Sequence, residues 1–480
     1  MPVLLSSTGT LLNADIHRFH VEFNPSKDPI LFPRHPGIDI NFLRVRVSNT
    51  CPLYKIASVL SGPFELSTSL HQEVADGYMC GKPQFSASIK CGQYWENKIQ
   101  EGKWVIEVVS EVKFSENPIT YAVTISTLDT PRSGIHSVIQ SPALSYYSLE
   151  TKDIFSTPLN VPNNSHLVVL THGVLGTRID FLYLYEKLLS HYDAKCGNGD
   201  NSVVPLACDS NHLGTFDGIE VAGRRIADQI LTTVNYSREN ESKKEDWNCK
   251  YSKISFIGHS LGGILNLYAI EVLQQITHGK FFDVLTPMHF VTLASPLLGS
   301  HLIAPLKWVL IGGLLGQTGK DLALATPANT LQEPLLLQLA HPHSACHKIL
   351  RRFKSRSCYA NLLNDPLVNY RTSSLLYTGC YDLTSKLTVN QDRGEQNSYS
   401  GDVVLMDQVV EPSDFERFVS SLEDTSVEIE IARRWHSDMA WRKILISLKG
   451  NAHESIVVRR RFINAAGEKV IEHIIREHPM

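Results

Sequence analysis

No stretch of this sequence is long and apolar enough to cross a membrane as a helix. Such a helix needs roughly 18 or more uninterrupted apolar residues; the nearest approach, Leu302–Gly316, is shorter and contains Lys307. The N-terminal residues MPVLLSSTGT also lack the basic start and sustained apolar core of a secretory signal. We therefore expect a cytoplasmic protein that meets any lipid surface peripherally.

Paired cysteines and an excess of one charge are also missing. The nine cysteines are odd in number and form no Cys-x-x-Cys pair, which favours reduced thiols over a disulfide framework. A net charge of −4 offers no electrostatic attraction to nucleic acid. The acidic residues of the first 150 positions form no recognisable cation-binding loop. We expect no nucleic-acid partner, no metal and no cofactor.

The first third of the chain is rich in β-strand patterns. Apolar and polar residues alternate over Asn41–Val47, Trp104–Ser110 and Ile119–Ile125, and Gly and Pro clusters separate these runs. Residues 1–150 are therefore predicted to form a sandwich-like β-rich domain. A polar, Pro-containing linker follows.

Residues 160–480 show a different pattern, in which strands alternate with helices. A Val-rich strand over His166–Leu170 is followed by a helix from Phe181, and this order recurs along the chain. Such alternation predicts a mostly parallel sheet wrapped by helices, the α/β-hydrolase class. The polar stretch 388–425 is expected to be an irregular surface insertion.

The strongest local signal lies at Ile254–Ile264, where a short apolar run breaks into Gly-x-Ser-x-Gly before a helical pattern. This is the nucleophile elbow of α/β-hydrolases, a sharp strand-to-helix turn that exposes a serine hydroxyl. Ser260 is the predicted nucleophile. Gly258 and Gly262 are expected where a Cβ would collide with a neighbouring strand or helix.

A serine nucleophile needs a histidine base and a carboxylate that orients it, in the chain order Ser, acid, His. Asp365 ends the apolar strand Cys358–Leu363 and is the predicted acid. An aspartate before a proline is also a common turn residue, so a purely structural role stays open.

The base should lie in the loop after the last strand. His453 follows the alternating run Ile444–Leu448 and is the predicted base, with His436 as a rival that precedes the run. His473, on the predicted last helix, and His478, near the chain end, are expected at the surface.

The oxyanion hole needs two backbone N–H groups aimed at the developing charge. Leu261 follows the nucleophile and is expected to supply one. Val174, in the loop after the strand His166–Leu170, is expected to supply the other, and Gly173 lets that loop turn. His172 is expected to be structural, hydrogen-bonded beneath the loop.

Several motifs together resemble the serine esterase family known as domain of unknown function 676, in particular its lipase-like members. They are 171–177 (THGVLGT), 256–263 (FIGHSLGG), 291–300 (VTLASPLLGS), 359–365 (YANLLND), the stretch TGKDL from Thr318, and 441–462. The resemblance spans roughly 165–465, and the β-rich leader resembles the N-terminal extension of fungal lipase-like members. It implies an α/β-hydrolase that cleaves acyl esters of glycerolipids such as monoacylglycerol or phospholipid, with Ser260, Asp365 and His453 as its triad. The last motif favours His453 over His436.

Two further alternatives stay open. Beside a lipase site, Leu302–Gly316 could be a lid that touches a membrane or lipid-droplet surface, or a buried helix that packs on the sheet. The elbow chemistry is shared with thioesterases and acyltransferases, and a hydrolase domain can also decay into a non-catalytic lipid-binding scaffold. An intact Ser, Asp and His in the expected order argues against the scaffold.

Overall fold

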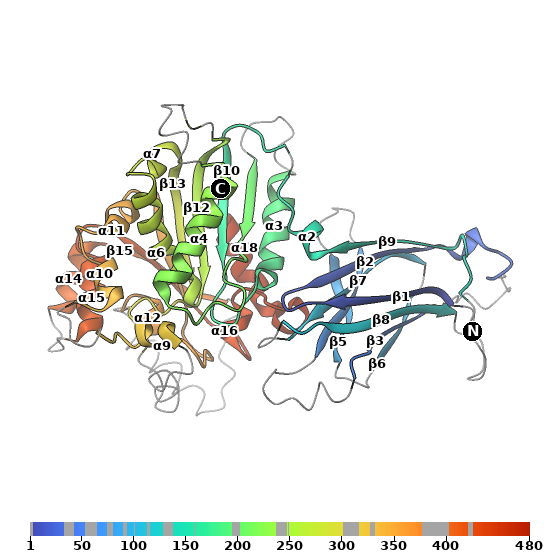
Figure 1. The fold of residues 1–480 in the computed structure, drawn as a ribbon. Helices are drawn as coiled ribbons and strands as arrows, with labels where there is room; N and C mark the ends of the chain where they lie inside the picture. Colours follow the sequence, from blue (N-terminus) through green and yellow to red (C-terminus); the bar gives the residue numbers. More distant parts are fainter. Residues whose placement is uncertain are drawn as a thin grey trace, which may run out of the picture. The chain divides into compact units, whose positions relative to one another are not determined.

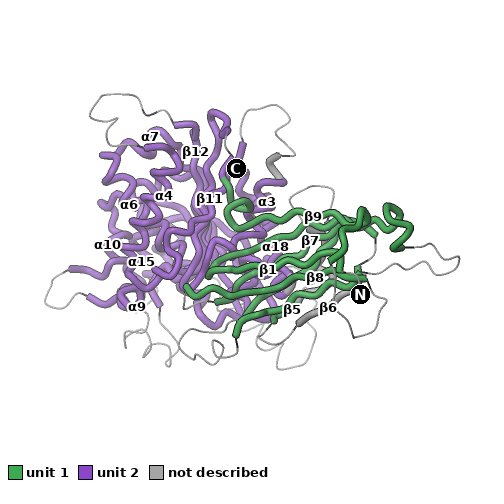
Figure 2. Tube along the Cα trace, turned by 45° about the vertical axis from the view of Figure 1, so that its right-hand side comes forward, with its two compact units in different colours: residues 1–156 green, residues 157–480 purple. Residues whose placement is uncertain are grey.

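The computed structural model divides the chain into two compact units, an N-terminal unit of residues 1–156 and a C-terminal unit of residues 157–480 (Figure 2). The structure describes residues 3–480 apart from 33–42, 53–64, 74–79, 90–93, 100, 113–115, 128–137, 159, 194–201, 237–246, 248, 301–315, 327–331, 377–402 and 421–425. The predicted lid or buried helix at Leu302–Gly316 lies outside these residues except for Gly316.

The N-terminal unit consists of two antiparallel sheets, with strand orders β1-β8-β3-β6 and β5-β4-β7-β2-β9. Alternating side chains of each sheet turn inward, so Val45 of β3 and Ile106 of β7 share one hydrophobic core. The elements are β1 (Val3–Leu11), β2 (Ile16–Phe23), η1 (Pro25–Lys27), β3 (Leu43–Asn49), β4 (Leu66–Glu73), β5 (Cys80–Ile89), β6 (Tyr94–Ile99), β7 (Gly102–Ser110), β8 (Ile119–Thr127), β9 (Leu144–Glu150) and α2 (Thr151–Ile154). The β-rich character predicted for this part of the chain is confirmed.

The C-terminal unit is built on a seven-stranded sheet of order β11-β10-β12-β13-β14-β16-β15. Each neighbouring pair is parallel except β15 and β16. Its strands are β10 (Ser165–Thr171), β11 (Val203–Ala207), β12 (Tyr251–His259), β13 (Thr286–Leu293), β14 (Ser355–Asn361), β15 (Val404–Val410) and β16 (Trp441–Ile446). The predicted α/β-hydrolase architecture is confirmed.

Helices cover both faces of this sheet, which explains why the central strands are buried on both sides. Figure 1 shows α4 (Ile219–Thr233) and α6 (Leu261–Ile276) on one face and α18 (Glu468–Glu477) on the other. The remaining elements are η2 (Arg178–Phe181), α3 (Leu182–Asp193), α7 (Phe281–Val284), α9 (Gly316–Leu322), α10 (Leu335–Leu339), α11 (Ala345–Leu350), α12 (Tyr370–Ser373), α14 (Pro412–Val419), α15 (Val427–Trp435), α16 (Ala452–Ser455), α17 (Arg461–Asn464) and η3 (Ala465–Gly467). None of the helices in the described part of the chain could cross a membrane.

The expected irregular insertion over 388–425 was wrong for the residues that can be described. Val404–Val410 forms the antiparallel edge strand β15, and Pro412–Val419 forms α14. Asp407, Gln408 and Val409 of the edge strand are exposed residues, and α14 fully buries only Phe415 and Val419. Because so few of their residues are buried and apolar, both segments look polar in the sequence. Residues 388–402 and 421–425 lie outside the description.

The expectation that His473 and His478 lie at the surface was also wrong. Both are buried, because the apolar side of α18 packs against the sheet. The Tyr359 hydroxyl on β14 lies 2.9 Å from His473 Nδ1 and 3.2 Å from His478 Nε2. His289 donates a hydrogen bond from Nε2 to the carbonyl of Pro479, at 2.9 Å. These contacts anchor the last residues of the chain on the sheet.

Candidate active site

Ser260 stands at a sharp turn between β12 and α6. Its backbone torsions, φ 54° and ψ −126°, fall in a region that non-glycine residues rarely adopt. Its N–H donates to the carbonyl of Leu293 at the end of the neighbouring strand β13, at 2.9 Å. The side chain is therefore presented at the carboxyl edge of the sheet, at the N-terminus of a 16-residue helix. The positive end of that helix dipole favours developing negative charge.

Three glycines allow the chain to come this close to Ser260. A Cβ on Gly258 would lie 2.4 Å from the backbone N of Gly263, and one on Gly262 would lie 2.0 Å from the carbonyl oxygen of Thr171. A Cβ on Gly173 would lie 2.6 Å from Ser260 Cβ. The loop after β10 therefore packs directly against the serine, and a larger residue at any of these positions would displace it.

Asp365 lies in a tight turn just beyond β14. The turn starts at Asn364, whose φ of 61° reverses the chain. Oδ1 of Asp365 accepts hydrogen bonds from the N–H groups of Leu367 and Val368, at 3.0 and 2.8 Å. Oδ2 accepts one from Asn361 Nδ2 at 2.8 Å. Both carboxylate oxygens are thus held in a fixed direction.

His453, on the short helix α16, completes the coordination of this carboxylate. Its Nδ1 lies 3.0 Å from Asp365 Oδ2, and both side chains are almost fully buried. Because a carboxylate can only accept, Nδ1 carries the proton, and Nε2 is then the basic nitrogen. Burial alone would raise the pKa of Asp365, but the hydrogen bond and charge of His453, with the Asn361 amide, hold it below its usual value.

His436 is placed quite differently. It ends α15, with its ring stacked on Phe415 at a centroid distance of 3.7 Å and its Nδ1 donating to the carbonyl of Ala432 at 2.7 Å. Burial, with the charge of Lys443, lowers the pKa of its ring well below the usual value. These contacts describe a packed core histidine.

The two expected oxyanion donors flank Ser260. Among the described residues, no backbone carbonyl accepts a hydrogen bond from the N–H of Val174 or Leu261. The carbonyl of Gly173 accepts one from Gly176 N at 3.1 Å and one from His172 Nδ1 at 3.0 Å. His172 thus lies buried under its own loop and braces it. Both candidate N–H groups stay available for a substrate oxygen.

His259, immediately before the nucleophile, is a site residue that the motif alone did not reveal. Its Nε2 donates to the backbone carbonyl of His453 at 2.8 Å, and the two rings lie 4.7 Å apart. Burial, then the proximity of His453, lowers the pKa of His259 to about 3, so it is neutral at physiological pH. It links the nucleophile turn directly to the base.

The sequence also showed no sign of an ion-pair chain that starts at the buried Asp180 and ends at the partly exposed Glu454. Arg459 Nε lies 3.0 Å from Asp180 Oδ1, and Arg459 Nη1 lies 2.6 Å from Glu454 Oε1. Asp180 Oδ2 also accepts from the N–H of Thr177, at 3.0 Å. The chain therefore joins the segment after the oxyanion loop to α16, which carries His453. Partners 279 positions apart leave no local signal.

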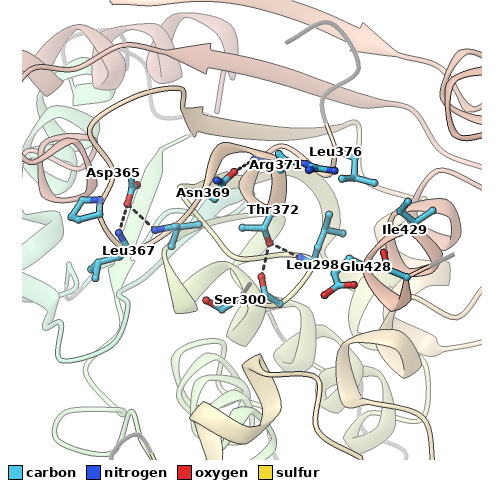
Figure 3. A pocket seen from close by; sticks show the side chains of 14 residues that line it. Leu298, Ser300, Asp365, Leu367, Asn369, Arg371, Thr372, Leu376, Glu428 and Ile429 are labelled. Carbon is cyan, nitrogen blue, oxygen red and sulfur yellow. Dashed lines mark hydrogen bonds between the residues drawn. The ribbon is translucent and has the colours of Figure 1, made fainter. Parts of the chain in front are cut away.

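A cavity of about 430 Å³ opens beside the acid loop. Figure 3 shows Asp365 at one end and Glu428 and Ile429 at the other, with Leu298 and Thr372 between them. Neither Ser260 nor His453 lines it. Of the three triad candidates, only Asp365 borders this cavity.

Comparison with known proteins gives consistent similarities to esterases and lipases. Residues 161–380 match the family described as "Putative serine esterase (DUF676)". "Putative lipase ROG1" of Saccharomyces cerevisiae is 28% identical over an alignment that covers 92% of this chain and 79% of that protein. A lipase-named relative from Schizosaccharomyces pombe is 29% identical, covering 69% of this chain and 43% of its own length.

Solved structures are much more distant. Est1E from Butyrivibrio proteoclasticus is 12% identical with a TM-score of 0.28, covering 67% of this chain and 91% of its own. The lipase-esterase related protein from Clostridium acetobutylicum gives the same identity and TM-score, and covers 67% and 97%. Similarities this weak do not indicate a function for this chain. The match to the putative serine esterase family over residues 161–380, together with the lipase-named relatives, supports a hydrolase.

Proposed function

We propose that this hydrolase cleaves lipid acyl esters through an acyl-enzyme on Ser260. The observation that carries the proposal is the Asp365–His453 hydrogen bond of 3.0 Å, which leaves Nε2 of His453 as the base while His259 ties His453 to the serine turn. A strained Gly-x-Ser-x-Gly turn without these partners would name only a nucleophile.

In this mechanism His453 Nε2 takes the proton of Ser260 as Oγ attacks the ester carbonyl. The resulting tetrahedral oxyanion is stabilised by the N–H groups of Val174 and Leu261 and by the N-terminus of α6. Collapse breaks the bond to the alcohol, which takes the proton back from His453. Water then attacks the acyl-enzyme by the same steps in reverse, releasing the fatty acid and restoring Ser260.

Asp365 supports this cycle without taking a proton itself. Its carboxylate fixes the tautomer of His453 and stabilises the imidazolium that forms during each attack. The lowered pKa of Asp365 keeps it ionised at neutral pH, as this role requires.

The proposed substrates are acyl esters of glycerolipids such as monoacylglycerol or phospholipid. The lipase-named relatives support this class, and the cavity beside Asp365 offers apolar walls at Leu298, Val368 and Ile429 for part of an acyl chain. Because such substrates sit at a lipid–water boundary, we propose that the enzyme acts at the cytoplasmic surface of a membrane or lipid droplet. A turnover panel of mono-, di- and triacylglycerols and phospholipids would identify the preferred ester.

The decisive experiment replaces the nucleophile. Ser260→Ala should reduce hydrolysis of p-nitrophenyl butyrate by about 10³-fold or more, because the remaining groups cannot form an acyl-enzyme. Ser437→Ala, at an exposed serine that does not line the cavity, is the matched control and should keep most of the activity. A fluorophosphonate should label the parent protein on Ser260. A folded parent without that adduct, or a Ser260→Ala protein with undiminished turnover, would contradict the proposal.

A further inference from the structure

The N-terminal unit exposes large apolar side chains that its own packing does not need. Ile30 is 93% exposed and Val138 60%, and Ile139 is exposed as well. All three lie in loops at the end of the unit where β1 and β9 begin and β2 ends (Figure 1). Single exposed apolar residues are ordinary on a protein surface. Three aliphatic residues in linked loops at one end form a group that needs an explanation.

Ile30 projects from a loop that is otherwise well held. Asp28 accepts a hydrogen bond from Leu31 N at 3.1 Å and another from Ser141 Oγ at 2.6 Å. Phe32 is buried, with its ring 5.2 Å from that of Phe23. The loop thus buries Phe32 and holds Ile30, two residues earlier, exposed to solvent. A local rearrangement that hid Ile30 would break these contacts.

The loop that carries Val138 and Ile139 is tied to the same end. Ile139 N donates to the carbonyl of Val3 at 2.8 Å, which joins this loop to the start of β1. Asn24 N donates to the carbonyl of Ala143 at 2.8 Å, which joins it to the loop of Ile30. These hydrogen bonds connect the two loops. We call their exposed aliphatic residues the aliphatic tip: Ile30, Val138 and Ile139.

Two tyrosines lie behind the aliphatic tip on the edge strand β9. Tyr146 and Tyr147 are both more than half exposed, two and three residues beyond the first residue of β9. Tyr147 stacks on His20 of the paired strand at a centroid distance of 4.5 Å, so its ring is held in place. Aliphatic residues at the extremity with tyrosines behind them match the order of environments across a lipid–water interface.

Among the described residues near the aliphatic tip, the charges balance one another. Lys27 is paired with Glu22 at 3.1 Å, and Lys103 stands opposite Glu22 in the β2–β7 register. Asp28 is the further acidic group of the same loop. A surface without excess positive charge gains little from anionic lipids. It suits a lipid surface of low net charge, where apolar insertion supplies the binding energy.

We propose that the aliphatic tip inserts into the surface of a phospholipid membrane made of zwitterionic lipid. The inference deepens the proposed lipid-ester hydrolysis, on which it rests, by assigning contact with the lipid surface to the N-terminal unit. Each inserted aliphatic side chain leaves water for an apolar layer, while the tyrosine hydroxyls stay at its polar boundary.

The test is flotation of the full-length chain with phosphatidylcholine vesicles, on a Ser260→Ala background so that no lipid is consumed. The parent should float with the vesicles, and Ile30→Gln with Val138→Gln should weaken partitioning by about tenfold or more. Leu12→Gln is the matched control. Leu12 is 52% exposed but lies at the opposite end of β1, so its replacement should change partitioning less than twofold.

Other outcomes would overturn the inference. These are a parent chain that does not float, a double variant that floats as well as the parent, or binding that requires added phosphatidylserine. Hydrolysis of soluble p-nitrophenyl butyrate by the same surface variants with Ser260 restored should equal that of the parent. If the chain with Ser260 intact and no surface substitution does not hydrolyse this ester, the proposed chemistry is refuted. Vesicle flotation tests the docking surface independently of that chemistry.

Discussion

At the scale of single residues, the geometry around Ser260 is set by backbone groups as much as by side chains. The carbonyl of Leu293 holds the serine N–H, and the carbonyl of His453 accepts from His259. A positioning hydrogen bond to a backbone carbonyl fixes where a segment lies, and here that segment carries the base. His259 therefore ties the turn of Ser260, the proposed nucleophile, to the segment of His453, the proposed base.

Removing this donor should slow catalysis while leaving substrate binding almost unchanged. For His259→Leu we expect kcat for p-nitrophenyl butyrate to fall about tenfold, the equivalent of one net hydrogen bond, with KM changed little. His259→Gln keeps a donor near the position of Nε2 and should recover most of the rate. Steady-state kinetics with thermal melts of both variants provide the measurement. Equal rates for the Leu and Gln variants would show that the hydrogen bond does not position the base.

The sequence predicted roles for residues that belong to a recognisable motif. It missed residues that act through contacts with positions far away in the sequence. Ser260, Asp365 and His453 could be proposed because each follows a recognisable strand. Asp365 and His453 are hydrogen-bonded to each other. His259 occupies an x position of Gly-x-Ser-x-Gly, which any residue can fill, so the motif predicted no role for it. Its role depends on a carbonyl 194 positions away, which only the folded chain brings near.

At the scale of elements, the ion-pair chain Asp180–Arg459–Glu454 joins two short helical segments. Asp180 belongs to η2, just after the oxyanion loop, and Glu454 belongs to α16, which carries His453. Burial would raise the pKa of Asp180, but the charges of Arg459 and Arg460 hold it below its usual value. Because α16 is a single turn, it cannot hold its own position. The ion pair supplies that constraint.

Breaking this ion pair should destabilise the protein and disturb the site together. Arg459→Leu leaves the buried Asp180 carboxylate with the N–H of Thr177 and the more distant Arg460, at 3.9 Å, and should cost about 3 kcal/mol of unfolding free energy. Ester turnover should fall with it. Adding Asp180→Asn removes the stranded charge and should restore part of the stability. Urea unfolding of the single and double variants measures this. A single variant as stable as the parent would contradict it.

At the scale of the whole molecule, the alternation of strand and helix predicted the order of the central sheet elements well. Strands buried on both faces, such as β10, give continuous apolar runs that cannot be mistaken for surface loops. The edge strand β15 was missed because only one side of it is covered, so its residues look like a polar insertion. Burial of His473 and His478 was missed for a related reason. A polar residue on a mostly polar helix gives no sign that the chain end folds back onto the sheet.

Those buried histidines give the whole molecule a pH dependence. Burial, as the largest cause, lowers the pKa of His166, His259 and His478 to about 3 in each case. Unfolded, each would titrate near 6.5, so between those values the unfolded state binds more protons than the native state. Stability is therefore complete above pH 6.5 and is lost as the pH falls towards 3. Each histidine contributes about 1.4 kcal/mol per pH unit within that window.

Urea unfolding at a series of pH values should show this directly. We expect a flat free energy of unfolding between pH 8 and 7 and a steep decline below about 6.5, before most carboxylates begin to titrate. His478→Phe removes one of the three groups and should make the decline shallower by about one proton's slope, even if the variant is less stable at pH 8. A decline that starts only below pH 4, or equal slopes in the parent and His478→Phe, would show that buried neutral histidines do not set the acid sensitivity of the fold.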